Sequence, residues 1–388
     1  MKFFKIVLFT LLFIGLCLFL PVRYFQWSIK PIIGEESTQS LQFSATSIIE
    51  TPIVHSAMHP KLIAEAESYG YTNINGPSLI KVPDWIENKL GAYYLYFAHH
   101  KGPYIRLAYA DTLTGPWTMY EGEILPLAKA GLATASKPAL GVIKLKQHLK
   151  WTEFFALLDI GTKAKKAYET RTKQKLKSSP PTTPHVASPE ILIDEVEKKI
   201  RLYYHGVKEG NLQMSKVALS ADGLHFSPLD GIISVPYLRV FPYRNQYYGL
   251  AMPGFLYRSK DGLRDFEVRK RWLFDTNVRH SSVYLQGTML YVFFTKVGDA
   301  PEQIYYSSVD ISAEDWNDWQ ASPPKVLLKP TKAWEGANEP ILPSMRGEMS
   351  TLVNQLRDPA IFEENGELYL LYTGGGEQAI GIAKLAIE

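Results

Sequence analysis

The chain has 388 residues, 46% of them hydrophobic and 21% charged, which are the proportions of a folded globular protein. A net charge of +3 is too small to argue for nucleic acid as a partner, and 23 Tyr and 18 Phe favour β-strands. The single cysteine, Cys17, excludes a disulfide framework, so the fold must rest on its hydrophobic core.

An apolar segment opens the chain. Lys2 and Lys5 precede residues 6–22, where only one Thr, one Gly and one Pro interrupt the apolar run. A helix of ~20 such residues spans a bilayer, and no small-x-small cleavage site follows that would mark a secretory signal. We therefore expect residues 1–30 to hold an uncleaved membrane anchor, with a cleaved signal as the alternative. Either way the rest of the chain is exported: anchored to a membrane, secreted or periplasmic.

A strand–turn–strand unit recurs along the rest of the chain. Residues 31–60 have the pattern of a linker and a leading strand. Residues 279–284 then align without a gap with residues 357–362, and each segment is followed by a polar turn and an aromatic-rich strand. Similar units begin near residues 76, 188 and 237. Such recurrence predicts an all-β, five-bladed propeller over residues 61–388, with a strand near residues 41–53 completing the ring.

Residues 128–184 interrupt this rhythm after the first blade. They include a lysine-rich stretch, residues 163–177, followed by Ser-Ser-Pro-Pro. The composition favours a partly helical insertion with a solvated charged face. The alternative is a docking surface for an acidic polysaccharide, for anionic lipid headgroups or for a partner of a non-enzymatic scaffold.

We expect the chemistry where the inner strands meet the propeller axis. Side chains two residues apart share one face of a strand. Superposing the repeats then places five pairs on the axis: Gly76 with Ser78, Ser188 with Glu190, Tyr237 with Arg239, His280 with Ser282, and Asp358 with Ala360. Because buried charge requires compensation, converging charged groups predict a functional site.

The blade pattern resembles a known family. Short blades, the Arg357-Asp358-Pro359 sequence and outer edges with Asp-Gly turns are similar to glycoside hydrolase family 43 and its relatives among the invertases, levansucrases and anhydrogalactosidases. The resemblance covers about residues 71–385 without the insertion. It implies a propeller that hydrolyses glycosidic bonds with carboxylates at the inner-strand starts. Asp358 matches such a carboxylate best, and Glu190 is next.

The chain departs from that pattern in its first two blades. Where the family has an Asp before the first-blade Pro, this chain has Gly76 with Asn75 beside it, and the second blade has Ser188. Neither an amide nor a hydroxyl is a strong base at neutral pH. A non-catalytic carbohydrate-binding propeller is therefore the rival function.

Hydrolysis needs one carboxyl group as acid and a second group as base or nucleophile. We expect Asp358 to be the base or nucleophile and Glu190 the acid, while His280 is the alternative proton donor. The competing interpretations are structural. Asp358 would cap a turn, Glu190 would pair with Arg239, and His280 would form axial hydrogen bonds or hold an axial metal such as calcium. No other cofactor is expected.

Further side chains are candidates for binding a carbohydrate. They are Tyr237, Arg239, Arg279, Arg357, Asn75, Ser188, Trp334 and Glu339. Arginine binds carboxylate and sulfate in a bidentate manner, which suits an acidic sugar. Trp334 is expected either to stack on a sugar ring or to pack on a blade within a closing strap. His99, His100 and His205 end aromatic strands and are candidates for the rim of the site.

Overall fold

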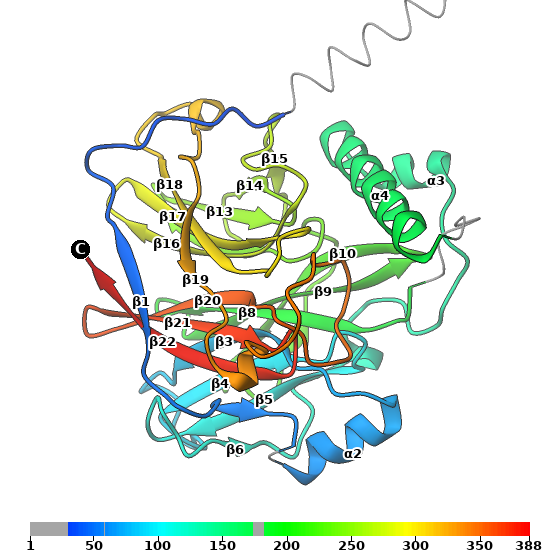
Figure 1. Ribbon diagram of the computed structural model, residues 1–388. Helices are drawn as coiled ribbons and strands as arrows, with labels where there is room; N and C mark the ends of the chain where they lie inside the picture. Colours follow the sequence, from blue (N-terminus) through cyan, green and yellow to red (C-terminus); the bar gives the residue numbers. More distant parts are fainter. Residues whose placement is uncertain (1–29, 58, 174–181) are drawn as a thin grey trace, which may run out of the picture.

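The computed structural model describes residues 30–57, 59–173 and 182–388. Five antiparallel sheets stand around a common axis, which confirms the predicted five-bladed propeller (Figure 1). Blade one comprises β3 (Asn75–Lys81), β4 (Tyr93–Ala98), β5 (Tyr104–Ala110), β6 (Thr118–Met119) and β7 (Leu125–Pro126). Blade two comprises β8 (Val186–Asp194), β9 (Lys199–Glu209), β10 (Leu212–Ser220) and β11 (Ser227–Pro228). Blade three comprises β12 (Arg239–Tyr243), β13 (Gln246–Ala251), β14 (Phe255–Ser259) and β15 (Glu267–Val268).

The last two blades include the ring closure. Blade four comprises β16 (Val278–Gln286), β17 (Met289–Lys296), β18 (Ile304–Asp310) and β19 (Lys325–Leu328). Blade five comprises β20 (Arg357–Glu364), β21 (Glu367–Gly374), β22 (Ala379–Ile387), β1 (Phe43–Ser47) and β2 (Val54–His55). Strand β1 pairs antiparallel with β22, from Phe43 opposite Ile387 to Ser47 opposite Ala383. The expected completion of the ring by an N-terminal strand is confirmed.

The core consists of five apolar clusters, one between each pair of neighbouring blades. Strands in the middle of a blade face such a cluster on both sides, so they are apolar throughout rather than alternating. All six residues of β4 are buried, for example. Aromatic residues suit these strands because they fill the wedge between two twisted sheets.

The outer edge of blade one is short. Residues 105–110 lie in its third strand, and the fourth strand, β6, has only two residues. Short edge strands limit pairing with other chains. The Asp-Gly turns lock neighbouring blades together, since the carbonyl of Gly223 accepts from the Tyr96 hydroxyl and that of Gly262 from Tyr203.

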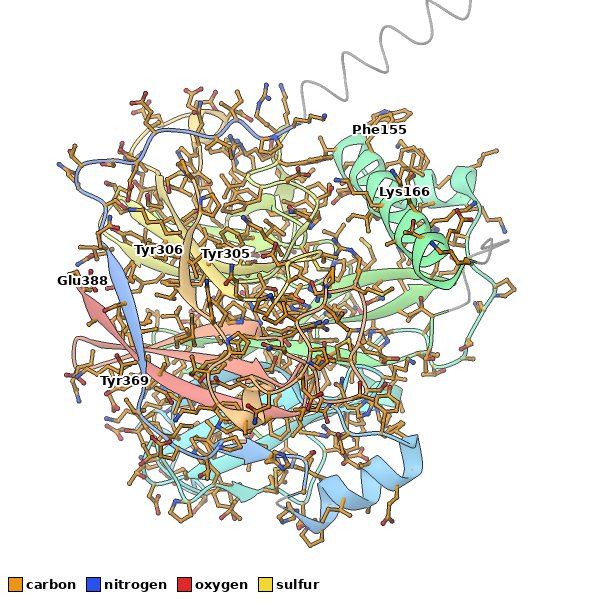
Figure 2. All side chains as sticks on the ribbon, viewed as in Figure 1. Phe155, Lys166, Tyr305, Tyr306, Tyr369 and Glu388 are labelled. Atoms are coloured by element: carbon orange, nitrogen blue, oxygen red, sulfur yellow. The ribbon has the colours of Figure 1, made fainter. Side chains whose placement is uncertain are left out.

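The insertion is partly helical, as predicted. It contains α3 (Val142–His148) and α4 (Trp151–Thr172), and the remaining helices are α2 (Pro60–Tyr69), η1 (Leu127–Lys129), η2 (Trp316–Asp318) and η3 (Ala333–Glu335). The first turns of α4 are tied to the propeller, because Phe154 and Ala156 join the core between blades two and three and Glu153 accepts from the Tyr257 hydroxyl at 2.6 Å. Figure 2 shows Phe155 and Lys166 on α4 at the periphery of the molecule.

The expected N-terminal anchor falls on residues 1–29, outside the described residues. In the parts of the chain that the structure describes, no helix has the length and apolarity to cross a bilayer.

Candidate active site

Each of the five inner strands has a residue in the left-handed backbone region near its start; in blade three this residue lies two positions before β12. These residues are Gly76, Ser188, Tyr237, His280 and Asp358, with φ of 58°, 50°, 70°, 51° and 49°. In four blades the register to the second strand shifts by one residue at this point, which is a β-bulge. This corrects the assumption of simple alternation: the bulge, and not a period of two, orients these side chains. A positive φ costs a non-glycine residue ~1–3 kcal/mol, and such residues cluster at functional sites.

Gly76 shows why blade one carries no carboxylate at this position. A Cβ atom added to Gly76 would lie 2.9 Å from the Cα of Ser188 in the next blade. Only glycine adopts the left-handed conformation there without steric cost and leaves room for Ser188. The departure from the family pattern is therefore built into the packing of blades one and two.

Three blades bring their first side chains together in an axial trio of Tyr237, His280 and Asp358. The Tyr237 hydroxyl donates a hydrogen bond to Asp358 Oδ1, and the Thr373 hydroxyl donates to Oδ2 at 3.2 Å. The His280 ring stacks on Tyr237 with centroids 5.0 Å apart. Its Nδ1 lies 3.3 Å from Asp358 Oδ1 without hydrogen-bond geometry.

Burial sets the protonation of the trio. Asp358 is 1% exposed, and this burial, together with the nearby carboxylate of Glu377, raises its pKa. Burial and the charges of Arg279 and Arg357 lower the pKa of His280 well below its usual value. His280 is therefore neutral at working pH and carries no proton to donate as imidazolium, which favours Glu190 over His280 as the proton donor.

Glu190 lies on β8, two residues after Ser188. Its carboxylate accepts from Arg239 Nη1 at 2.8 Å and from the Ser78 hydroxyl at 3.4 Å. Burial raises its pKa against the opposing effect of Arg239, while 18% of its side chain is exposed. The pair with Arg239, which is the structural alternative considered for Glu190, is present, and the Arg239 guanidinium also lies 4.7 Å from the Tyr237 ring centroid. Arg239 thus contacts Glu190 directly and Tyr237 through its ring, and the Tyr237 hydroxyl binds Asp358.

A buried ion-pair network of Arg279, Glu302, Arg357 and Glu377 flanks the trio. Arg279 binds Glu302 through two nitrogens, and Arg357 lies 3.3 Å from Glu302 and 3.0 Å from Glu377. Although burial alone would raise it, the two arginines hold the pKa of Glu302 below its usual value. Arg279 and Arg357 are 2% and 0% exposed, so they act on a ligand only through the groups they hold.

Histidine and tyrosine rings form an arc around the axis. Ring centroids are 6.2 Å apart from His100 to His185, 5.7 Å from His185 to His205 and 6.2 Å from His205 to Tyr237, which stacks on His280. Burial lowers the pKa of His205 well below its usual value and that of His185 to about 4. The arc is therefore an uncharged, largely buried wall. His100 follows the end of β4, whereas His205, expected at a strand end, lies inside β9. His99 instead packs against Tyr69 and Tyr71.

The described residues were compared with the ligand sets that hold metal ions in proteins. The described residues contain no group of three or more His, Cys, Asp or Glu side chains placed to hold a metal ion. The carboxylate of Asp358 lies 3.3 Å from Nδ1 of His280. An axial calcium ion beside His280 stays a prediction.

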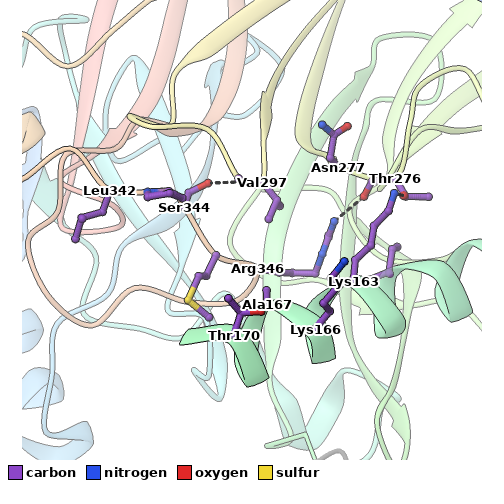
Figure 3. Close-up of a pocket in the computed structure, with 14 residues that line it drawn as sticks. Lys163, Lys166, Ala167, Thr170, Thr276, Asn277, Val297, Leu342, Ser344 and Arg346 are labelled. Atoms are coloured by element: carbon purple, nitrogen blue, oxygen red, sulfur yellow. Dashed lines mark hydrogen bonds between the residues drawn. The ribbon is translucent and has the colours of Figure 1, made fainter. Parts of the chain in front are cut away.

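A pocket of about 710 Å³ lies between α4 and the loops next to β16 and β17, and no side chain of the trio lines it. One wall is the second half of α4, and the opposite wall is the loop of residues 342–346 (Figure 3). This loop rests on the axis, because the carbonyls of Met345 and Gly347 accept hydrogen bonds from Arg357, the neighbour of Asp358.

The remaining candidates lie apart from the trio or at its edge. Asn75 is buried and donates to Asn73, and Ser188 is buried against Gly76. Trp334 stacks on Tyr372 of blade five and donates to the Glu50 carbonyl, which is the packing alternative considered for it. Glu339 is half-buried in the same strap, where its carbonyl accepts from the Asn354 amide.

Sequence reasoning missed three charged or titratable residues of this region: Glu302, Glu377 and His185. Glu377 follows three glycines in the turn between β21 and β22. Glu302 lies in the loop between β17 and β18. Neither residue therefore lies on an inner strand. The glycine run before Glu377 was a usable signal, since it marks a close backbone approach. Nothing in the local pattern distinguishes Glu302.

The chain has relatives among known proteins. No protein-family model matches it. Over 338 residues it is 32% identical to "Uncharacterized protein R118" of Acanthamoeba polyphaga mimivirus, a match that covers 81% of this chain and 83% of the viral protein. The chain belongs to the family of this viral protein. The mimivirus member thus shares most of its length with the propeller, and its name states no activity.

Solved enzymes of glycoside hydrolase family 43 are also similar to the chain. A beta-xylosidase/alpha-arabinofuranosidase from a compost microbial metagenome, in complex with xylotriose, is 12% identical, with a TM-score of 0.48 and coverage of 88% of this chain and 94% of the enzyme. An enzyme of that family from Xanthomonas citri, also with xylotriose, is 12% identical, with a TM-score of 0.48 and coverage of 88% and 89%. The five blades are seen in the five sheets of this chain itself.

Proposed function

We propose that this chain is a glycoside hydrolase that cleaves poly- or oligosaccharides at the propeller axis. The observation that carries the proposal is the pair of carboxyl groups, Asp358 and Glu190, held at the axis with raised pKa values and connected through Arg239 and Tyr237. Enzymes of this reaction class use one carboxyl group as acid and a second as base or nucleophile. The backbone strain near the starts of the inner strands supports a reacting site there.

The two carboxyl groups have different surroundings, which suits different roles. Glu190 keeps a raised pKa although Arg239 opposes it, so its protonated form can give a proton to the leaving glycosidic oxygen. Asp358 accepts from Tyr237 and Thr373, which orient its carboxylate. Asp358 then either takes a proton from the attacking water or attacks the anomeric carbon itself. NMR of the first product distinguishes these routes, because direct water attack inverts the anomeric centre and a covalent intermediate retains it.

The direct test is release of sugar from neutral and acidic polysaccharides by the full chain in detergent, with Asp358→Asn alongside. We expect release by the wild type and a loss of at least a hundredfold in the variant. Equal release by both would remove Asp358 from the mechanism. Retention on a polysaccharide without any release would replace the hydrolase by a carbohydrate-binding propeller.

We also propose that the chain acts outside the cytoplasm, attached to a membrane by its N-terminal segment or released after cleavage. The apolar run of residues 6–22 after two lysines supports this location. Resistance of the expressed full chain to alkaline extraction from membranes is the expected result for an anchor. Recovery of a shortened chain from the medium would indicate cleavage instead.

A further inference from the structure

One long connection of the propeller, between β19 and β20, has no regular structure over most of its length. Its residues 336–354 form neither helix nor strand. Connections of this length are uncommon in compact domains, and many of them are lids over active sites. We name its central part, residues 342–349, the axial loop.

The axial loop is bonded to four of the five blades. The bonded groups are the Asp299 carbonyl of blade four, the Met252 sulfur of blade three, the Arg357 guanidinium of blade five and the Lys101 ammonium of blade one. Three of these groups lie in loops that follow the second strand of a blade, and Arg357 begins β20. In an antiparallel blade the end of the second strand lies beside the start of the first. The axial loop therefore spans the end of the propeller where the trio lies.

The trio at that end of the propeller is enclosed. Asp358, Tyr237 and His280 are 1%, 4% and 7% exposed. A saccharide therefore reaches Asp358 only after a covering segment moves. Because the axial loop belongs to no sheet, its displacement breaks individual hydrogen bonds and ion pairs and leaves the blades intact.

Glu348 holds the axial loop to blade one. Its carboxylate accepts a hydrogen bond from the Tyr71 hydroxyl at 3.0 Å and is paired with the Lys101 ammonium. The side chains of the ion pair are partly exposed, so water can replace their bond at little cost. The preceding residue, Gly347, has a φ of 103°, and no atom lies within 4 Å of a Cβ added there. The backbone next to Glu348 thus has room to turn.

There is also space into which the axial loop can move. The pocket of about 710 Å³ separates residues 342–346 from the second half of α4 (Figure 3). A displacement of the loop toward α4 fills this space. It does not require any blade to shift.

We propose that the axial loop is a lid, which Glu348 holds closed and which lifts toward α4 to admit a saccharide to Asp358. The inference rests on the proposed function, because it assumes that a saccharide reacts at the axis. The closed lid keeps bulk water from Asp358, and the open lid admits the substrate.

The first test measures access to Asp358 without any substrate. The full-length chain in detergent is treated with a water-soluble carbodiimide and an amine, and mass spectrometry follows labelling at Asp358. Hydrogen exchange of residues 342–349 is measured on the same preparation. Glu348→Gln is expected to raise both rates at least threefold, because a neutral amide cannot form the ion pair with Lys101.

Glu364→Gln is the matched control. Glu364 also binds one tyrosine hydroxyl and one lysine ammonium, those of Tyr93 at 2.8 Å and Lys81 at 2.6 Å. It lies at the other end of β20 from Asp358. Its substitution is expected to leave the labelling of Asp358 and the exchange of the axial loop unchanged.

Three results of this comparison would overturn the proposal. Equal increases in the two variants would show a general effect of a lost ion pair. Faster exchange of the axial loop with unchanged labelling of Asp358 would place the entrance elsewhere. No change of either rate in Glu348→Gln would show that Glu348 does not hold the loop closed.

A reversible cross-link tests whether the lid must open for turnover. In a Cys17→Ser background, Tyr71→Cys and Glu348→Cys are joined by a short bis-maleimide whose spacer contains a disulfide. Sugar release is expected to fall at least tenfold in the cross-linked chain and to return after reduction. The same double variant without the reagent is the control.

The two tests separate the lid from the proposed hydrolase. Undiminished sugar release from the cross-linked chain overturns the lid and keeps the hydrolase. Labelling of Asp358 that rises with the exchange of the axial loop, without sugar release by any form of the chain, keeps the lid and removes the hydrolase.

Discussion

Two groups of charged side chains lie near the axis, and they differ in how far their buried charge is compensated. The ion-pair network sets two arginines, Arg279 and Arg357, against two glutamates and leaves its members almost fully enclosed. The axial trio has one carboxyl group, a phenol and a neutral imidazole, and that carboxyl group has a raised pKa. Compensated charge stabilises a structure, whereas charge that is only partly compensated remains able to react.

The largest expected effect concerns the trio. Asp358→Asn keeps the shape of the side chain but removes the base, so we expect the rate of sugar release to fall by about 10²–10⁴-fold. The free energy of unfolding is expected to change little, because burial already disfavours the Asp358 carboxylate. Initial rates together with urea unfolding of the same preparation measure both. A large loss of stability would place Asp358 with the network instead.

The network is expected to respond in the opposite way. Glu302→Gln leaves Arg279 and Arg357 without one of their two carboxylates, and breaking a buried pair costs about 3–5 kcal/mol of unfolding free energy. Urea unfolding is the measurement. The exposed Glu363→Gln is the control and is expected to stay within about 0.5 kcal/mol of the wild type. Equal stability of both variants would contradict the assignment of the network as structural.

A smaller effect is expected at the start of blade one. Gly76→Ala combines a positive φ with a Cβ placed 2.9 Å from Ser188 Cα. We expect the free energy of unfolding to fall by ~1–3 kcal/mol because of the backbone strain, and further because of this contact. Gly287→Ala is the matched control, since its φ of 61° is nearly the same but no atom lies within 4 Å of the added Cβ. The difference between the two variants in chemical unfolding isolates the contact between blades one and two. Equal losses would leave only the backbone conformation as the cause.

The smallest effect is expected from the histidine arc. Burial and the neighbouring His100 lower the pKa of His185 to about 4, from about 6.5 in the unfolded chain. Between these values the unfolded state binds more protons than the folded state, so stability rises with pH from about 4 to 6.5 and this contribution is constant above. Melting temperature against pH is expected to show a shallower acid slope for His185→Gln. An unchanged slope would assign the acid loss to other groups.

Much of the fold could be predicted from sequence because each blade repeats one local pattern. The Arg357-Asp358-Pro359 unit and its counterpart at His280 align without a gap, and strand pairing within a blade is local in sequence. The position of the outer strand of blade one could not be predicted, because a two-residue strand such as β6 leaves no periodicity to detect.

The site was only partly predictable. The convergence of Asp358, His280 and Tyr237 follows from aligning the repeats, since equivalent positions on a ring face one axis. The bulge that orients them does not follow, because it depends on backbone conformation that serine, histidine and aspartate adopt only under tertiary constraint. Glu302 and Glu377 could not be predicted for another reason. They lie in loops whose course is set by packing and not by a repeat.

The pairing of β1 with β22 has a consequence for how the chain folds. Phe43 and Ile387 belong to one sheet although nearly the whole described sequence separates them. Forming that sheet means closing a loop that contains four other blades, so contact order is high and closure is expected to be late and slow. Until then, β22 presents an unpaired edge on which a second molecule can add its own strand. Strand exchange between molecules is therefore most expected after β20, β21 and β22 have paired and before β1 joins β22.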